Sequence, residues 1–186
     1  MTPQGIRANI LVIANGACDG GNGRPVTYPK GLVAVRISAE NEDAVKGELL
    51  WSREDIGGYA LPTIQEGLVY VQAQGMQVLD LMTGKTLAKV ALPREVSVNH
   101  LTSVAGGHLF GFDARGACLV TTLGKDAKVV GVNRLGTKGS GRGEGWFNQS
   151  AQPFFSGNRI FIRSYTGVYC VGEPSQPMRL SQEHRR

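Results

Sequence analysis

The chain has 186 residues, of which 41% are hydrophobic and 19% charged, with a formal net charge of +5. This composition is ordinary for a globular domain and excludes disordered and fibrous proteins. The positive excess is small and is not interleaved with aromatic residues, so nucleic-acid binding is not predicted. No apolar stretch is long enough for a membrane-spanning helix. The 26 glycines, about twice the usual share, predict many turns and short strands, as in all-β folds.

The three cysteines, Cys18, Cys118 and Cys170, form no CxxC motif, so neither a zinc site nor a redox pair is predicted. Cys118 and Cys170 lie in apolar runs, and both are predicted to be buried, inert thiols. The apolar run at 10–14 is too short for an export signal. It is predicted to be a strand, and no signal peptide is predicted in this chain.

The first strand-like runs are ILVIA (10–14) and GLVAVRI (31–37), followed by KGELLWS (46–52). Between the first two lies a stretch rich in turn-forming residues, which is predicted to be a long loop. No run of helical periodicity occurs here or later in the chain.

The second group of runs begins with ALPTIQ, in which Pro62 predicts a strand start or an edge position. After the third run, Asp80, Thr83 and Gly84 combine an acceptor, a hydroxyl and a residue tolerant of positive φ, which predicts a turn. The runs are ALPTIQ (60–65), GLVYVQA (67–73), GMQVLDL (75–81) and TLAKVAL (86–92).

The same order of runs occurs twice more, and the last group ends after its third run. Pro153 occupies the place of Pro62. The third group is HLTSVA (100–105), GHLFGFD (107–113), GACLVTT (116–122) and GKDAKVVGV (124–132). The fourth is SAQPFF (150–155), NRIFIRS (158–164) and GVYCVGE (167–173).

A glycine begins one run in each group, at Gly31, Gly75, Gly116 and Gly167, which are 44, 41 and 51 residues apart. Four short strands in about 40–50 residues is the period of a propeller blade. The runs are nearly continuously apolar, which predicts strands covered on both faces. The sequence therefore predicts an all-β partial β-propeller of about four four-stranded antiparallel blades, with the last blade incomplete.

The predicted array is a single domain over 1–173, followed by a polar tail at 174–186. Its approximate blades are 1–56, 57–98, 99–148 and 149–173.

The pattern P-x-x-x-x-G-x-V-Y-V, followed by G-x-x-V-L-D-x-x-T-G-K, resembles the repeat of the pyrroloquinoline-quinone-like (PQQ-like) β-propellers, which include quinoprotein alcohol dehydrogenases. The resemblance extends over 60–92, 31–52 and 150–172. Gly47 and Trp51 match the family's Gly-x-x-x-Trp strand, which implies that Trp51 docks on the neighbouring blade.

The chain departs from this family in two respects. Ala88 and Lys128 stand where further docking tryptophans are expected, and four blades are visible where the family normally has six to eight. The resemblance therefore implies the C-terminal half of a longer propeller, or a half that pairs with a second copy. Relatives are usually exported from bacteria, so a periplasmic or other extracytoplasmic location is expected.

The function that follows is a non-catalytic binding or scaffold module, because a propeller presents its loops on a stiff support. Its expected partner is a protein, a missing propeller half or a second copy. The alternative is a fragment of a quinoprotein-type (PQQ-dependent) oxidoreductase whose cofactor residues lie mostly outside this chain. PQQ and calcium would then be needed, with Trp146 as a stacking face and Glu144 and Asn148 near the cation.

The loops 15–30 and 136–148 are the candidate contact surface, because insertions in repeat folds collect on the binding face. The candidate partner contacts are Arg142, Trp146, Phe147 and Asn148. The competing interpretation makes Trp146 and Phe147 hydrophobic contacts between blades.

No catalytic or metal-binding residues are predicted. The three histidines, at 100, 108 and 184, are scattered. Asp80 and Asp113 are expected to cap turns rather than to catalyse a reaction.

Overall fold

A computed structural model describes most of the predicted strand regions. The described residues are 6–7, 9–15, 31–39, 44–56, 61–72, 75–94, 96, 102–113, 116–135, 152–163 and 167–172. In these residues the protein is all-β, with four antiparallel sheets and no helix, as predicted. The described part of the chain therefore contains no membrane-spanning helix.

Each sheet is a meander in which consecutive strands are hydrogen-bonded neighbours. The first sheet consists of β1 (Ile6–Arg7), β2 (Ile10–Asn15), β3 (Gly31–Ala39) and β4 (Val45–Arg53). The second consists of β5 (Thr63–Gln65), β6 (Leu68–Gln72), β7 (Met76–Asp80) and β8 (Thr86–Val90). The third consists of β9 (Thr102–Ala105), β10 (His108–Phe112), β11 (Ala117–Thr122) and β12 (Val129–Arg134). The fourth consists of β13 (Phe154–Ser156), β14 (Arg159–Arg163) and β15 (Val168–Gly172).

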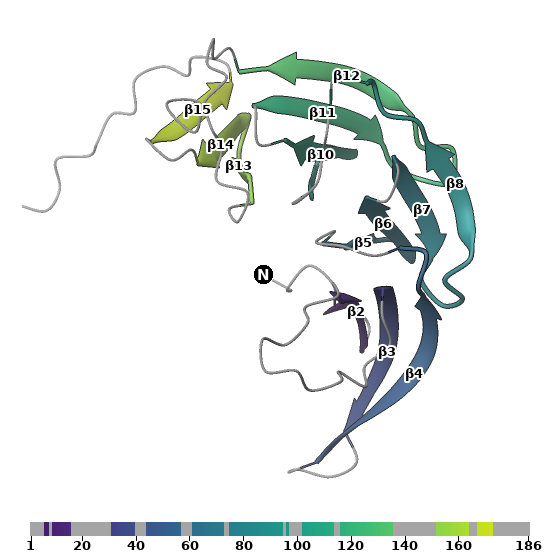
Figure 1. Ribbon diagram of the computed structural model, residues 1–186. Helices are drawn as coiled ribbons and strands as arrows, with labels where there is room; N and C mark the ends of the chain where they lie inside the picture. Colours follow the sequence, from purple (N-terminus) through teal and green to yellow (C-terminus); the bar gives the residue numbers. More distant parts are fainter. Residues whose placement is uncertain are drawn as a thin grey trace, which may run out of the picture.

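The four sheets follow one another along an arc in chain order (Figure 1). The early strands of each sheet lie on the inside of the arc, and the last strand lies on the outside. The arc is open between the first and the fourth sheets, and the sheets do not close into a barrel.

Hydrophobic side chains fill the space between consecutive sheets. Along β6, Val69 and Val71 pack towards the first sheet, whereas Tyr70 packs towards the third. At the last junction, Ile162 of the fourth sheet packs against Phe112 of the third. Because successive residues of a strand point to opposite faces, a strand between two neighbours must be apolar at nearly every position. This accounts for the continuous apolar runs in the sequence.

Polar contacts link the inner strands of neighbouring sheets. The hydroxyl of Thr63 on β5 contacts the hydroxyl of Thr102 on β9. Ser103 Oγ donates to the carbonyl of Pro153, at 3.1 Å, and Gln152 Nε2 donates to the carbonyl of Thr102, at 3.2 Å. Pro62 and Pro153 each lie immediately before an inner strand, as predicted.

On the outer side, Trp51 of β4 packs against the second sheet. Its Nε1 donates to the carbonyl of Leu81, at 2.9 Å, and its indole lies over Gly84. A Cβ on Gly84 would lie 2.6 Å from Cδ2 of the indole. Arg53 adds a hydrogen bond of 2.8 Å to the carbonyl of Gly84. The predicted docking of Trp51 on the neighbouring unit is confirmed.

The third and fourth strands of the first three sheets pair with a β-bulge. The register shifts at Ala34/Val35, at Val78/Leu79 and at Val120/Thr121. In the first sheet the extra residue is Leu50, because Ala34 pairs with Trp51 and Val35 pairs with Leu49. The outermost strand thus gains one residue at a similar place in each of these sheets.

Two aspartates cap turns, as predicted. Asp80 Oδ1 accepts hydrogen bonds from the Thr83 hydroxyl and from the backbone N–H groups of Met82 and Thr83, at 2.8–3.0 Å. The hydrogen bond from the Thr83 hydroxyl is the largest cause of the lowered pKa of Asp80. Asp113 Oδ1 accepts from the backbone N–H of Ala117, at 2.7 Å.

One strand was not predicted, and one cysteine was placed wrongly. β1 contains only two residues, too few for a periodic pattern. Cys118 is buried as predicted, and burial raises the pKa of its thiol to about 12. Cys170 is exposed, so its predicted burial is wrong. It lies on β15, which no described strand follows along the sheet.

This difference predicts how the two thiols react. In dilute native protein, a chromogenic disulfide reagent should react with Cys170 and not with Cys118, because only an exposed thiol can form an accessible thiolate. Cys170→Ser should remove one fast-reacting thiol. Cys118→Ser should leave the number of thiols that react in the native protein unchanged. Equal losses from the two variants would contradict the difference in exposure. In denaturant, each variant should lose one thiol.

Candidate functional site

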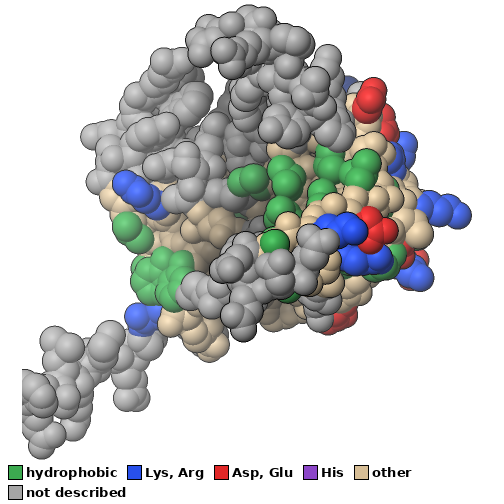
Figure 2. All heavy atoms as spheres, turned by 90° about the horizontal axis from the view of Figure 1, so that it is seen from below, with side chains coloured by type: hydrophobic (Ala, Val, Ile, Leu, Met, Phe, Trp, Pro, Cys, Tyr) green, Lys and Arg blue, Asp and Glu red, His purple; other side chains and the backbone are tan. Residues whose placement is uncertain are grey.

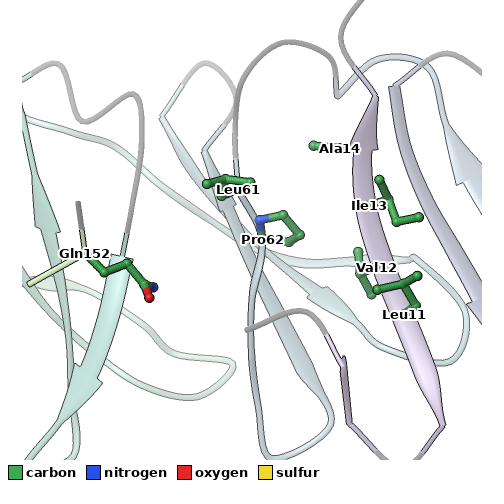
Figure 3. Close-up of a pocket in the computed structure, with 7 residues that line it drawn as sticks. All are labelled: Leu11, Val12, Ile13, Ala14, Leu61, Pro62 and Gln152. Carbon is green, nitrogen blue, oxygen red and sulfur yellow. The ribbon is translucent and has the colours of Figure 1, made fainter. Parts of the chain in front are cut away.

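A cavity of about 370 Å³ lies on the inside of the arc, beside the inner edge of β2 (Figure 3). Figure 3 shows Leu61 and Pro62 lying between β2 and Gln152. Its lining residues come from β2 and from the residues that precede β5 and β13: Leu11, Val12, Ile13, Ala14, Leu61, Pro62 and Gln152. Three sheets of the arc therefore contribute to one cavity.

The edge of β2 beside this cavity has unpaired backbone groups within the described structure. Ile37 N donates to the carbonyl of Asn9. Because every second residue of an antiparallel strand bonds to the same neighbour, residues 9, 11 and 13 direct their N–H and C=O groups towards β3. Val12 and Ala14 consequently direct their N–H and C=O groups to the opposite edge. There, β1 pairs only with Ile10 and Leu11.

The cavity combines apolar side chains with a row of backbone donors and acceptors. No charged side chain is among its described lining residues. The polar member, Gln152, uses its amide nitrogen to donate to Thr102. A free strand edge is a template for another extended segment. The arrangement is therefore suited to an uncharged, extended peptide, whose backbone would pair with Val12 and Ala14 and whose apolar side chains would enter the cavity.

The described groups with shifted pKa values lie elsewhere. Burial raises the pKa of Tyr70, whose hydroxyl accepts a hydrogen bond from the backbone N–H of Gly124, at 2.7 Å. The hydrogen bond from Arg53 lowers the pKa of Asp55. Tyr70 joins the second sheet to the third, and Arg53 joins the first to the second. These groups support the packing of the sheets and do not line the cavity.

The predicted partner contacts Arg142, Trp146, Phe147 and Asn148 lie outside the described residues. So do Glu144 and, apart from Asn15, the loops 15–30 and 136–148. Their roles stay predictions. In the part of the chain that is described, no three His, Cys, Asp or Glu side chains are grouped as a metal site requires.

The sequence reasoning missed the edge of β2 as a site. ILVIA was correctly identified as a strand, but its apolar residues resemble those of a strand covered on both sides. Within the described part of the chain, this edge is unpaired beyond Leu11 because β1 contains only two residues, and two residues carry no detectable pattern. The adjacent LPT segment was recognised as a strand start, which is the only signal that the sequence offered.

In comparisons with known proteins, no family model matches the chain and no curated protein matches it.

Proposed function

We propose that this protein is a non-catalytic binding module of the PQQ-like β-propeller repeat type, in which each sheet is one blade. The observation that carries the binding role is the edge of β2 beside an apolar cavity, where no described strand pairs with Val12 or Ala14. The ligand we propose is an extended, uncharged segment of a partner protein, bound as an added strand.

The blade interpretation is supported by the way in which the sheets repeat. Four meanders follow one another in chain order, and hydrophobic clusters lie between consecutive sheets. The contact of Trp51 with Gly84 agrees with the docking that the family resemblance implies. An extracytoplasmic location belongs to the same proposal and follows from the resemblance alone.

A stiff array is well suited to strand addition. The inner strands are tied to one another through Thr63, Thr102 and Ser103, so the edge of β2 faces residues that are already positioned. A preformed site loses little entropy on binding, and affinity then depends on the peptide's own ordering.

The test is selection of peptides from a displayed random library, followed by fluorescence anisotropy with the selected peptides. Ala14→Pro should weaken binding at least tenfold, because proline has no N–H to offer at the free edge. The ladder between β2 and β3 should survive, since the N–H of Ala14 points away from β3. Leu61→Asp should have a similar effect by placing a charge in the cavity.

Met82→Asp is the matched control, because Met82 is exposed to a similar extent as Leu61 but lies in the turn after β7. Its affinity should equal that of the wild type. Unchanged binding by both Ala14→Pro and Leu61→Asp would contradict the site. A spectral change and dye-coupled alcohol oxidation on adding PQQ and calcium would contradict the non-catalytic role and favour the quinoprotein alternative.

A further inference from the structure

The cavity beside β2 is bordered by residues from both faces of the first sheet. Residues 11–14, four in succession, all contribute to its lining. Successive residues of a strand point to opposite faces of the sheet. A peptide added along this edge therefore meets two different surroundings, one on each face.

The first of these surroundings lies towards the second sheet. Val12 is 4% exposed and belongs to the hydrophobic cluster between the first two sheets, against which Ala14 also packs. Figure 3 shows Leu61 and Pro62 on this side of β2. Residues directly opposite each other on paired strands share a face of the sheet. Peptide residues opposite Val12 and Ala14 would therefore point into this apolar corner.

The second surroundings lie on the face that turns away from the second sheet, where Ile13 is the central residue. Figure 3 shows Leu11 and Ile13 on the same side of β2, away from Leu61. Ile13 pairs with Val33 of β3, which is 7% exposed, whereas Ile13 is 44% exposed. The strand β3 covers one flank of Ile13, and among the described residues no strand covers the other. An added strand would cover that flank.

The face around Ile13 offers no ionic partner. None of its residues that the structure describes on the paired strands is charged. Figure 2 looks at the molecule from below, the side on which the first sheet lies in Figure 1, and shows hydrophobic side chains gathered there. A charged peptide residue opposite Ile13 would lose hydration against apolar side chains without gaining a partner. An apolar residue there would instead bury the exposed surface of Ile13.

We infer, on the basis of the peptide site proposed above, that Ile13 selects an apolar residue at the peptide position opposite it. The ligand is then a segment with three successive apolar residues. The outer two lie beside Leu61 and Pro62, and the middle one lies on Ile13. A strand with one solvated face instead alternates apolar and polar residues. If the peptide were read only on the side of the second sheet, such an alternating segment would be sufficient.

The first measurement uses peptides selected on the wild-type protein, which should carry three successive apolar residues. In variants of one selected peptide, Glu or Lys replaces each position in turn, and fluorescence anisotropy gives the affinity. At each of the three positions, either charge should weaken binding to the wild type about tenfold or more, because it enters apolar surroundings.

The second measurement exchanges the charge preference at the middle position. Ile13→Lys should bind the peptide with Glu there about fivefold more tightly than the peptide with Lys there, and Ile13→Glu should show the reverse preference, because directly opposite charges attract across two strands. Neither variant should rescue a charge at the two flanking positions, which point to the other face.

The matched control is Val45→Lys. Val45 is 73% exposed on the same face as Ile13, but it lies on β4 and pairs with Ala39. This variant should keep the wild-type preference for an apolar middle residue. Circular dichroism should show that the Ile13 and Val45 variants are folded.

A selected peptide that tolerates both charges at the middle position, with the same tolerance in Ile13→Lys, would overturn the role of Ile13. If Ala14→Pro and Leu61→Asp still weaken binding of that peptide, the peptide site stands and only the selection by Ile13 is wrong. Unchanged affinity in both of those variants would overturn the site and this inference together.

Discussion

Trp51→Ala is expected to lower the free energy of unfolding by about 3–5 kcal/mol, the usual range for a buried large aromatic side chain. The indole fills the space between β4 and the turn after β7, where Gly84 leaves room for it. Alanine would leave a cavity at this junction. It would also leave the carbonyl of Leu81 without its donor.

Chemical denaturation followed by circular dichroism measures this loss. Trp51→Phe is the matched variant, because it keeps a ring on Gly84 and removes the Nε1–H. Trp51→Phe should lose less free energy of unfolding than Trp51→Ala. The difference between the two losses should exceed the roughly 1 kcal/mol that one hydrogen bond contributes. A loss below about 1 kcal/mol for Trp51→Ala would show that the two sheets do not depend on this contact.

Gly31→Ala is expected to cost about 3 kcal/mol or more, since it combines backbone strain with a steric clash. Gly31 has φ of 93°, and a Cβ there would lie 2.1 Å from the carbonyl oxygen of Arg53. That oxygen belongs to the backbone of β4, so the strand itself would have to move. The contact of Arg53 with Gly84 would be displaced with it.

Gly67→Ala separates the two causes. Gly67 also has positive φ, of 77°, but a Cβ there would point into open space, with no atom beyond its chain neighbours within 4 Å. It should lose only the roughly 1–2 kcal/mol that a left-handed conformation costs a residue with a Cβ. Urea denaturation measures both losses in free energy of unfolding, with one slope of free energy against urea concentration used for the two variants. Equal losses at the two positions would mean that the approach of Arg53 is not the cause.

The strands were predictable because the sheets pack on one another, so side chains on both faces of a strand meet apolar surroundings. In GLVYVQA, Val69 and Tyr70 are both buried although they point in opposite directions, so the run is apolar throughout. The repeated glycine was also informative for a physical reason. Gly31 and Gly75 have positive φ, and each faces a carbonyl of the last strand of its sheet, that of Arg53 or Val90.

The candidate site was not predictable to the same extent, because it depends on what is adjacent in space. Cys170 has the apolar neighbours of a buried thiol, yet it is exposed because no described strand packs on its face of the fourth sheet. Among the described residues, the edge of β2 is unpaired beyond Leu11, because the described part of β1 contains only two residues. Neither fact is encoded in the local pattern of the strand concerned.

The bulge in β4 has a consequence for the shape of the array. Sheets fanned around an arc stand farther apart at the rim than near the centre, so each gap is a wedge that widens outwards. By adding Leu50, the bulge lets two successive side chains, Leu50 and Trp51, enter the same gap where it is widest. Deleting that residue would leave a regular ladder, in which Ala34 still pairs with Trp51 and Val35 with Leu49. The gap would then lose the side chain of Leu50 and be filled at its wide end by Trp51 alone.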